Sequence, residues 1–70
     1  MPGTYKLVDL VGTSPAGFAE ATKAAIEEAA KTIRHISWFE VTDQRGRVDK
    51  DGKIEYQVTL KVGFKIERAS

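Results

Sequence analysis

The stretch from Ile54 to Glu67 alternates between apolar and polar side chains without a break. Its apolar positions are Ile54, Tyr56, Val58, Leu60, Val62, Phe64 and Ile66. Because a strand points successive side chains to opposite faces of a sheet, this alternation predicts a long strand with one apolar and one polar face. The apolar face needs an element to cover it. The polar face, which carries Gln57 and Lys65, is the first candidate for function.

Two further elements are predicted before this strand. Thr4 to Val11 is rich in β-branched and aromatic residues and is followed by glycine, which indicates a first strand. Gly17 to Arg34 carries apolar residues at three- and four-residue spacing, many of them alanine, which predicts a helix that can lie close to a sheet. We expect Ser14 to cap this helix and Pro15 to occupy its first turn.

Ile36 to Val48 predicts a second strand, and residues 49–52 predict the turn into the last one. We expect Phe39 and Val41 to belong to the core. Regular alternation then puts three residues on the opposite face: Trp38, Glu40 and Thr42. A glycine between two arginines at 45–47 indicates a bulge or a bend, so we expect the strand to curve there. The order β-α-β-β predicts an α+β fold, a three-stranded antiparallel sheet with one helix across one face.

Seventy residues predict a single domain, residues 1–70, with a small core, since a domain of this size buries only about 60% of its unfolded surface. The chain has no cysteine and one histidine, which excludes disulfides and a zinc cluster as sources of stability. We therefore expect a homo-oligomer.

The charges are nearly balanced, with eleven Lys and Arg against ten Asp and Glu. This balance gives no electrostatic signature for nucleic acid or an anionic membrane. No apolar run approaches the length of a transmembrane helix, and no targeting segment is recognisable at the N-terminus. We expect a soluble, cytoplasmic protein.

Trp38 is the most informative single residue, because an indole on the face away from the helix has no covering element in its own chain. A subunit contact and a stacked ligand are equally good explanations, and a pocket between subunits would combine them. The Gln57 amide offers two donors and an acceptor, which match a ligand edge with carbonyl and N–H groups. A strand glutamine is more often solvated or paired across strands, and only closeness to Trp38 strengthens this candidate.

Arg45 and Lys65 are candidates for binding a phosphate, although exposed edge charges are the simpler interpretation. His35 lies between the helix and the second strand, where capping the helix C-terminus is a better explanation than catalysis. No paired carboxylates or catalytic triad are recognisable, so nothing in the sequence argues for an enzyme.

Four segments, taken together, resemble the bacterial dodecins. They are Val-Gly-Thr-Ser-Pro at 11–15, Trp-Phe-Glu-Val at 38–41, Arg-Gly at 45–46 and Tyr-Gln-Val-Thr-Leu-Lys-Val-Gly-Phe at 56–64. The resemblance runs nearly end to end. It implies a bent sheet wrapped around the helix and a hollow homododecamer that binds flavin, either FMN or riboflavin.

The resemblance also implies roles for particular residues. In dodecins, paired flavin rings lie between symmetry-related tryptophans at a twofold contact, a position that Trp38 matches, and Gln57 corresponds to the glutamine that binds the pyrimidine edge. Arg45 matches a basic residue near the ligand. Lys65 stands where the closest bacterial relatives are expected to carry arginine, which keeps the charge but loses the planar fork. The implied function is flavin storage with quenching of its photochemistry, and coenzyme A is a further candidate ligand.

Two other functions are weaker alternatives. A sheet-based binder of single-stranded nucleic acid would use Trp38 for stacking and Arg45, Arg47 and Lys65 for phosphates, but the near-zero net charge argues against it. A small enzyme that uses His35 ranks last.

Overall fold

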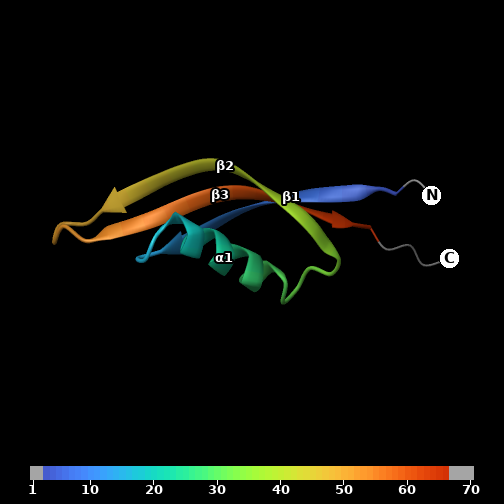
Figure 1. Ribbon diagram of the computed structural model, residues 1–70, viewed down its shortest axis with the longest axis horizontal. Helices are drawn as coiled ribbons and strands as arrows, with labels where there is room; N and C mark the ends of the chain where they lie inside the picture. The colour runs from blue at the N-terminus through green and yellow to red at the C-terminus, as the bar shows by residue number, and fades with distance from the viewer. Residues whose placement is uncertain (1–2, 67–70) are drawn as a thin grey trace.

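The computed structural model describes residues 3–66 of the chain. Its elements follow in the order β1 (Tyr5–Ser14), α1 (Phe18–Ala29), β2 (Ile36–Val48) and β3 (Ile54–Lys65). The strands form one antiparallel sheet in the order β1-β3-β2, which arches over the helix (Figure 1). The predicted α+β fold is confirmed, while Glu67, the predicted end of the last strand, lies outside the described residues.

The central position of β3 explains its strict alternation. Val58, Leu60 and Val62 are fully buried beneath α1, whose buried face consists of alanines 21, 25 and 29. These small side chains let the helix lie close to the sheet. On β1, Gly12 makes the same closeness possible, because a Cβ there would lie 2.8 Å from the Ala25 Cβ and would also meet the Ala21 carbonyl oxygen.

The helix is shorter than predicted at both ends. It begins at Phe18, with Gly17 at the N-cap, because β1 continues three residues past Val11 and pairs as far as Ser14 with Tyr56. The Ser14 Oγ accepts a hydrogen bond from the Ala16 N–H at 3.0 Å in the connecting bend. The predictions that Ser14 caps the helix and that Pro15 lies in its first turn are therefore wrong.

At the other end, α1 stops at Ala29 and Ala30 takes the C-cap position. His35 follows the intervening turn and loop, directly before β2, with a φ of 65°. Its carbonyl accepts a hydrogen bond from the Lys65 N–H at 3.2 Å, which ties the start of β2 to the end of β3. The predicted helix end at Arg34, beside His35, is wrong.

The pairing of β2 with β3 is irregular at other positions than the one that the sequence indicates. Its pairing with β3 shifts between Ile36 and Trp38 and again between Val41 and Asp43. Thr42 is the extra residue at the second shift, and its Oγ1 donates to the Thr59 carbonyl at 3.2 Å. Thr42 therefore does not continue the alternation. Residues 45–47 pair in register with residues 57–55, so β2 has no bulge at Gly46, and of the two predicted alternatives the bulge is wrong.

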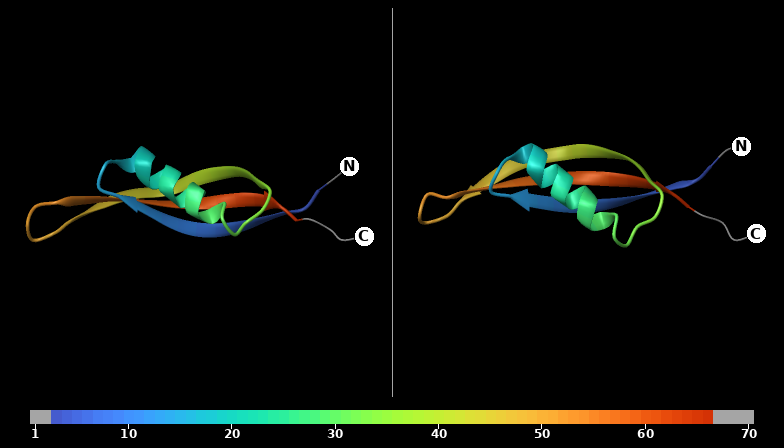
Figure 2. Two further views of the ribbon diagram at one scale, coloured as in Figure 1. Left: turned by 90° about the horizontal axis from the view of Figure 1, so that it is seen from below. Right: turned by 60° about the horizontal axis from the view of Figure 1, so that its bottom comes forward.

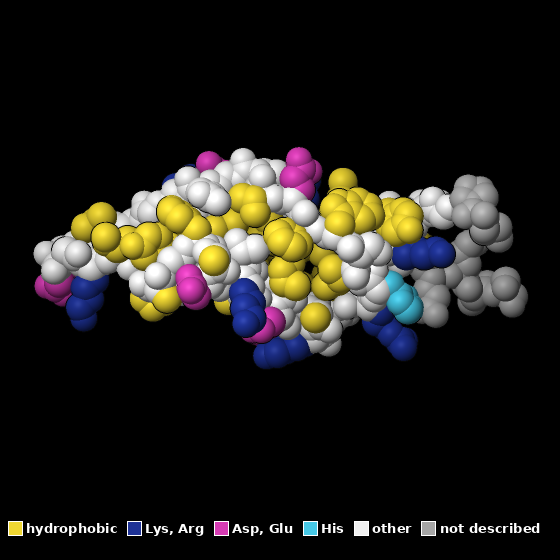
Figure 3. All heavy atoms as spheres, in the orientation of Figure 1, with side chains coloured by type: hydrophobic (Ala, Val, Ile, Leu, Met, Phe, Trp, Pro, Cys, Tyr) yellow, Lys and Arg dark blue, Asp and Glu magenta, His cyan; other side chains and the backbone are white. Residues whose placement is uncertain are grey.

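The β2 strand also contributes less to the core than predicted. Phe39 and Val41 pair with Val62 and Leu60 and so face the helix side, yet they are 50% and 38% exposed. The reason is that α1 packs against β1 and β3. With Val48 and Ile54 near the hairpin, these two residues form an exposed row that we call the apolar strip. Figure 3 shows hydrophobic side chains gathered along the length of the sheet.

The hairpin between β2 and β3 reaches well beyond the helix (Figure 2). Its turn is the predicted one: the Asp49 Oδ1 accepts hydrogen bonds from the Asp51 and Lys53 N–H groups at 2.9 Å each, and Gly52 adopts a φ of 80°. The chain measures 55 × 20 × 15 Å, and its radius of gyration is 14.6 Å, against about 11 Å for a compact chain of this length. Among residues 3–66, no helix is long and apolar enough to cross a bilayer.

Candidate ligand-binding face

The four predicted site residues all lie on the face of the sheet opposite α1, which we call the outer face. Residues that pair directly across an antiparallel sheet point to the same side. Trp38 pairs with Gly63, Arg45 pairs with Gln57, and Lys65 pairs with Tyr5. The buried hydrophobic residues of β3 that face the helix, Val58, Leu60 and Val62, have even numbers, so the odd-numbered Gln57, Gly63 and Lys65 lie on the opposite face. The prediction that Trp38 points away from the helix is therefore confirmed.

One end of this face is aromatic, and consists of Tyr5, Leu7, Trp38, Gly63 and Lys65, with Leu7 paired to Gly63 from β1. The indole of Trp38 lies over Gly63, where a Cβ would come within 2.5 Å of Cε2 and 2.6 Å of Cη2. The Tyr5 ring meets Trp38 with centroids 5.2 Å apart and planes at 60°, an edge-on geometry that aromatic pairs favour. Trp38 remains 43% exposed, so the indole lies on the sheet with room for a further contact.

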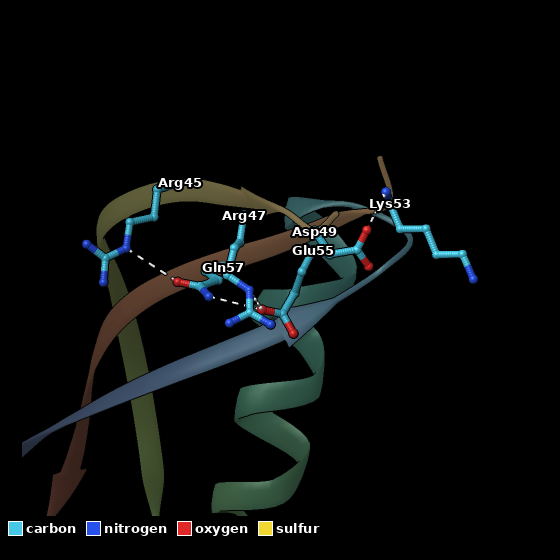
Figure 4. Close-up of polar contacts among 6 residues, drawn as sticks. All are labelled: Arg45, Arg47, Asp49, Lys53, Glu55 and Gln57. Atoms are coloured by element: carbon cyan, nitrogen blue, oxygen red, sulfur yellow. Dashed lines mark hydrogen bonds and ion pairs between the residues drawn. The ribbon is translucent and has the colours of Figure 1, made fainter. Parts of the chain in front are cut away.

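The other end is polar, and consists of Arg45, Arg47, Glu55 and Gln57 (Figure 4). The Gln57 Oε1 accepts a hydrogen bond from the Arg45 Nε at 3.4 Å, and the Gln57 Nε2 donates to the Glu55 Oε1 at 3.0 Å. The Arg47 Nε lies 3.8 Å from the same Glu55 oxygen. These contacts orient the amide of Gln57 and leave one of its N–H groups and one lone pair for a ligand.

The two ends are far apart within one chain. Gln57 and Gly63 are six residues apart along β3, which corresponds to about 20 Å at the rise of an extended strand. The Asp9 carboxylate and the Lys61 ammonium form a 3.0 Å ion pair between them. Arg45 belongs to the polar end and Lys65 to the aromatic end. A single chain therefore does not bring Gln57 close to Trp38, so closeness within one chain does not strengthen Gln57 as a candidate.

Three contributors were not singled out from the sequence: Tyr5, Glu55 and Gly63. A signal for Gly63 was present, because it is the one residue without a side chain on the polar face of β3. Tyr5 and Glu55 carried no such signal, since their contacts depend on cross-strand register and on a side-chain hydrogen bond.

Other features of the structure lie away from this face. A hollow of about 280 Å³ is lined by residues of α1, β1 and the turn after the helix, including Leu10, Ala29 and Ile33, and by none of the four predicted residues. Within residues 3–66, no three His, Cys, Asp or Glu side chains are grouped as metal ligands.

Comparisons with known proteins point to one family. The dodecin family model matches residues 4–67. The dodecin of Thermus thermophilus is 51% identical over 67 residues, which cover 96% of this chain and 97% of that protein. A crystal structure of a point variant of that dodecin superposes with a TM-score of 0.90 at 48% identity, over 97% of this chain and 100% of the other.

A relative of lower sequence identity has calcium in its name. The calcium dodecin of Mycobacterium tuberculosis is 37% identical over 65 residues, which cover 93% of this chain and 92% of that protein. Its crystal structure, described as having a novel calcium-binding site, superposes with a TM-score of 0.85 at 34% identity, over 96% of both chains.

Proposed function

This chain belongs to the dodecin family, and on that premise we propose that it is a flavin-binding storage protein that holds FMN between the subunits of a homo-oligomer. The observation that carries the proposal is the half-exposed indole of Trp38, supported from below by Gly63 on the outer face. A flat aromatic ring with an accessible face suits stacking on another flat ring system. Riboflavin, which has the same ring system, is the nearest alternative ligand.

Two kinds of contact divide the work in this proposal. Stacking on Trp38 supplies affinity through dispersion and apolar burial. The Gln57 amide supplies orientation, because its free N–H and lone pair match the alternating carbonyl and N–H groups on the pyrimidine edge of a flavin. Arg45 and Lys65 provide positive charge for the phosphate that distinguishes FMN from riboflavin.

A pocket built from both ends of the outer face requires a second copy of the chain. The distance of about 20 Å along β3 exceeds the length of a tricyclic ring, so Trp38 and Gln57 meet one flavin only if they come from different subunits. The elongated shape and the apolar strip also favour self-association. We propose the homododecamer that the family resemblance implies, with the flavin at a twofold contact.

The proposed role needs no catalytic turnover. A stacked indole quenches excited flavin by donating an electron, so a bound flavin is both stored and kept from photochemistry. We place this role in the cytoplasm. Coenzyme A is proposed as a second possible ligand. Calcium is not proposed, since the described residues offer no cluster of acidic ligands.

The test is a titration of FMN with the flavin-free protein, followed by flavin emission. We expect FMN emission to fall on binding in the native protein and in Asp9→Asn, a control on the same face that belongs to neither end. In Trp38→Ala we expect no quenching, with affinity weakened about 100-fold because each pocket loses two stacked indoles.

Three outcomes would contradict the proposal. Unchanged FMN emission in the presence of the native protein would contradict flavin binding. Elution as a monomer in size-exclusion chromatography would contradict a binding site between subunits. A salt-dependent interaction with a single-stranded oligonucleotide, without any response to FMN, would favour the nucleic-acid alternative.

A further inference from the structure

We propose that Gly63 and Tyr5 are positioning residues that hold the Trp38 indole flat on the sheet before any ligand arrives. The inference rests on the proposed flavin function for its consequence, but its geometry involves only residues of this chain. It explains why one position on the outer face of β3 carries no side chain. It also assigns Tyr5, which the sequence did not single out, to the site.

The position of Gly63 follows from the spacing of the strands. Tyr5 and Trp38 come from β1 and β2, the two outer strands of the sheet, which lie about 10 Å apart on either side of β3. Side chains from outer strands can meet only above the central strand. There they need a position without a side chain, and Gly63, which pairs directly with Trp38, provides it.

The contacts show how complete this arrangement is. The three atoms nearest to a Cβ at Gly63 all belong to the indole of Trp38, at distances that real side chains do not tolerate. Tyr5 then closes one side of the indole with its ring, 5.2 Å away between centroids. The glycine sets the height of the indole above the sheet, and the tyrosine limits its rotation.

The consequence is a preformed stacking surface. A ring that is already ordered loses less rotamer freedom when a ligand stacks on it, so more of the stacking energy appears as affinity. A Cβ at position 63 would lift or turn the indole, which would disorder the surface while leaving Trp38 in the chain.

The primary test uses the flavin-free protein and exploits the single tryptophan, because its emission and near-ultraviolet circular dichroism report on Trp38 with only tyrosine and phenylalanine as background. In Gly63→Ala we expect higher accessibility to acrylamide, lower emission anisotropy and a weaker indole dichroism band. The matched control is Gly46→Ala, because a Cβ there meets only ordinary contacts, the nearest at 3.5 Å from the Glu55 carbonyl oxygen. Unchanged tryptophan signals in a folded Gly63→Ala protein would overturn the proposal.

Tyr5 is tested by Tyr5→Leu against Tyr5→Phe. We expect Tyr5→Leu to lower the emission anisotropy of Trp38, and Tyr5→Phe to preserve it because the ring edge remains. Equal signals from the two variants would remove Tyr5 from the proposal.

A double-mutant cycle covers the case in which Gly63→Ala folds poorly. With Trp38 present, the substitution should lower the midpoint of urea unfolding. In the Trp38→Ala background the same substitution should raise the midpoint or leave it unchanged, because the obstructing ring is gone and alanine restricts the unfolded chain. A destabilisation of equal size in both backgrounds would show that the need for glycine has nothing to do with Trp38.

The flavin measurement separates this inference from the proposed function. If native protein binds FMN, Gly63→Ala should weaken binding about tenfold while Gly46→Ala does not, a loss comparable to one stacking contact. If the native protein does not bind FMN but the tryptophan signals of Gly63→Ala change as expected, the flavin function is wrong and the positioning role stands. If FMN binds with native affinity to Gly63→Ala, the positioning role fails and the flavin function stands.

Discussion

The aromatic and polar ends of the outer face hold their side chains in place by different means. At the aromatic end, Trp38 is positioned by shape, against the surface of Gly63 and the edge of Tyr5. At the polar end, Gln57 is positioned by hydrogen bonds to Arg45 and Glu55. Contacts set by shape do not depend on ionic strength, whereas exposed ionic contacts weaken with salt. For the proposed flavin site we therefore expect stacking on Trp38 to supply affinity at any ionic strength, and the hydrogen bonds of the polar end to supply selectivity.

Of the substitutions considered below, Gln57→Leu, at the polar end, is expected to weaken FMN binding the most. The change keeps the side-chain volume but leaves the pyrimidine edge of a bound flavin without a partner, which should weaken FMN binding about tenfold or more. Emission of the FMN that does bind should remain quenched, because Trp38 is intact. A titration of FMN with rising protein concentration gives the affinity from its midpoint and the quenching of bound FMN from its plateau. A loss of quenching at saturation would show that the two ends do not have separate roles.

Trp38→Phe tests the aromatic end, where it separates stacking from quenching. A phenyl ring still stacks, so FMN affinity should fall only about fivefold. Phenylalanine is much harder to oxidise than tryptophan, so bound FMN should emit more strongly than in the native protein. Time-resolved emission of the saturated complex measures this directly. Full quenching in Trp38→Phe would exclude electron transfer from residue 38 as the quenching mechanism.

Lys65→Gln addresses the charge at the aromatic end. Removal of one exposed cation near the phosphate should weaken FMN binding about fivefold and leave riboflavin binding unchanged. The difference between the two flavins should shrink at high salt. In Lys65→Arg the planar fork should favour FMN further. Equal losses for FMN and riboflavin would mean that Lys65 does not contact the phosphate.

The smallest effect is expected for Arg47→Gln. The Arg47 side chain is 71% exposed, and its contact with Glu55 is long at 3.8 Å. Exposed ion pairs of this kind contribute about 0.5 kcal/mol or less to stability. Urea unfolding should therefore be nearly unchanged, and FMN binding should stay within about twofold. A larger loss of binding than in Arg45→Gln would show that the hydrogen bonds around Glu55 are needed to orient Gln57.

The sequence alone predicted the features that depend on local periodicity. The alternation in β3 predicted a long strand, the apolar face that contains the buried Val58, Leu60 and Val62, and the face on which Gln57 and Lys65 lie. The alanine-rich spacing predicted the helix and its buried side. These features were readable because a strand repeats every two residues and a helix every 3.6, so each residue's face follows from its neighbours in the chain.

Features that depend on contacts distant in the sequence were not predicted correctly. Ser14 was taken for a helix cap because capping residues look alike in any loop, whereas the structure uses it to pair with Tyr56. A bulge or a bend was predicted at Gly46, whereas the register shifts between Ile36 and Trp38 and again at Thr42, whose hydroxyl donates to the Thr59 carbonyl. Phe39 and Val41 were assigned to the core because nothing in β2 shows that the helix packs on the other two strands.

For the candidate site, the sequence determined that Trp38, Gln57 and Lys65 share the outer face, and the tertiary structure added Arg45 and decided how the four residues are grouped. Face is a local property of a regular strand, so Trp38, Gln57 and Lys65 could be assigned to it one strand at a time. Arg45 lies on it only because the extra residue Thr42 reverses the alternation along β2. Grouping depends on the register between strands, which pairs Trp38 with Gly63 and Arg45 with Gln57 and so divides the residues between two distant ends. Register is set by the packing of all three strands and the helix together. That is the physical reason why only the fold revealed the support beneath Trp38 and the separation of Trp38 from Gln57 within one chain.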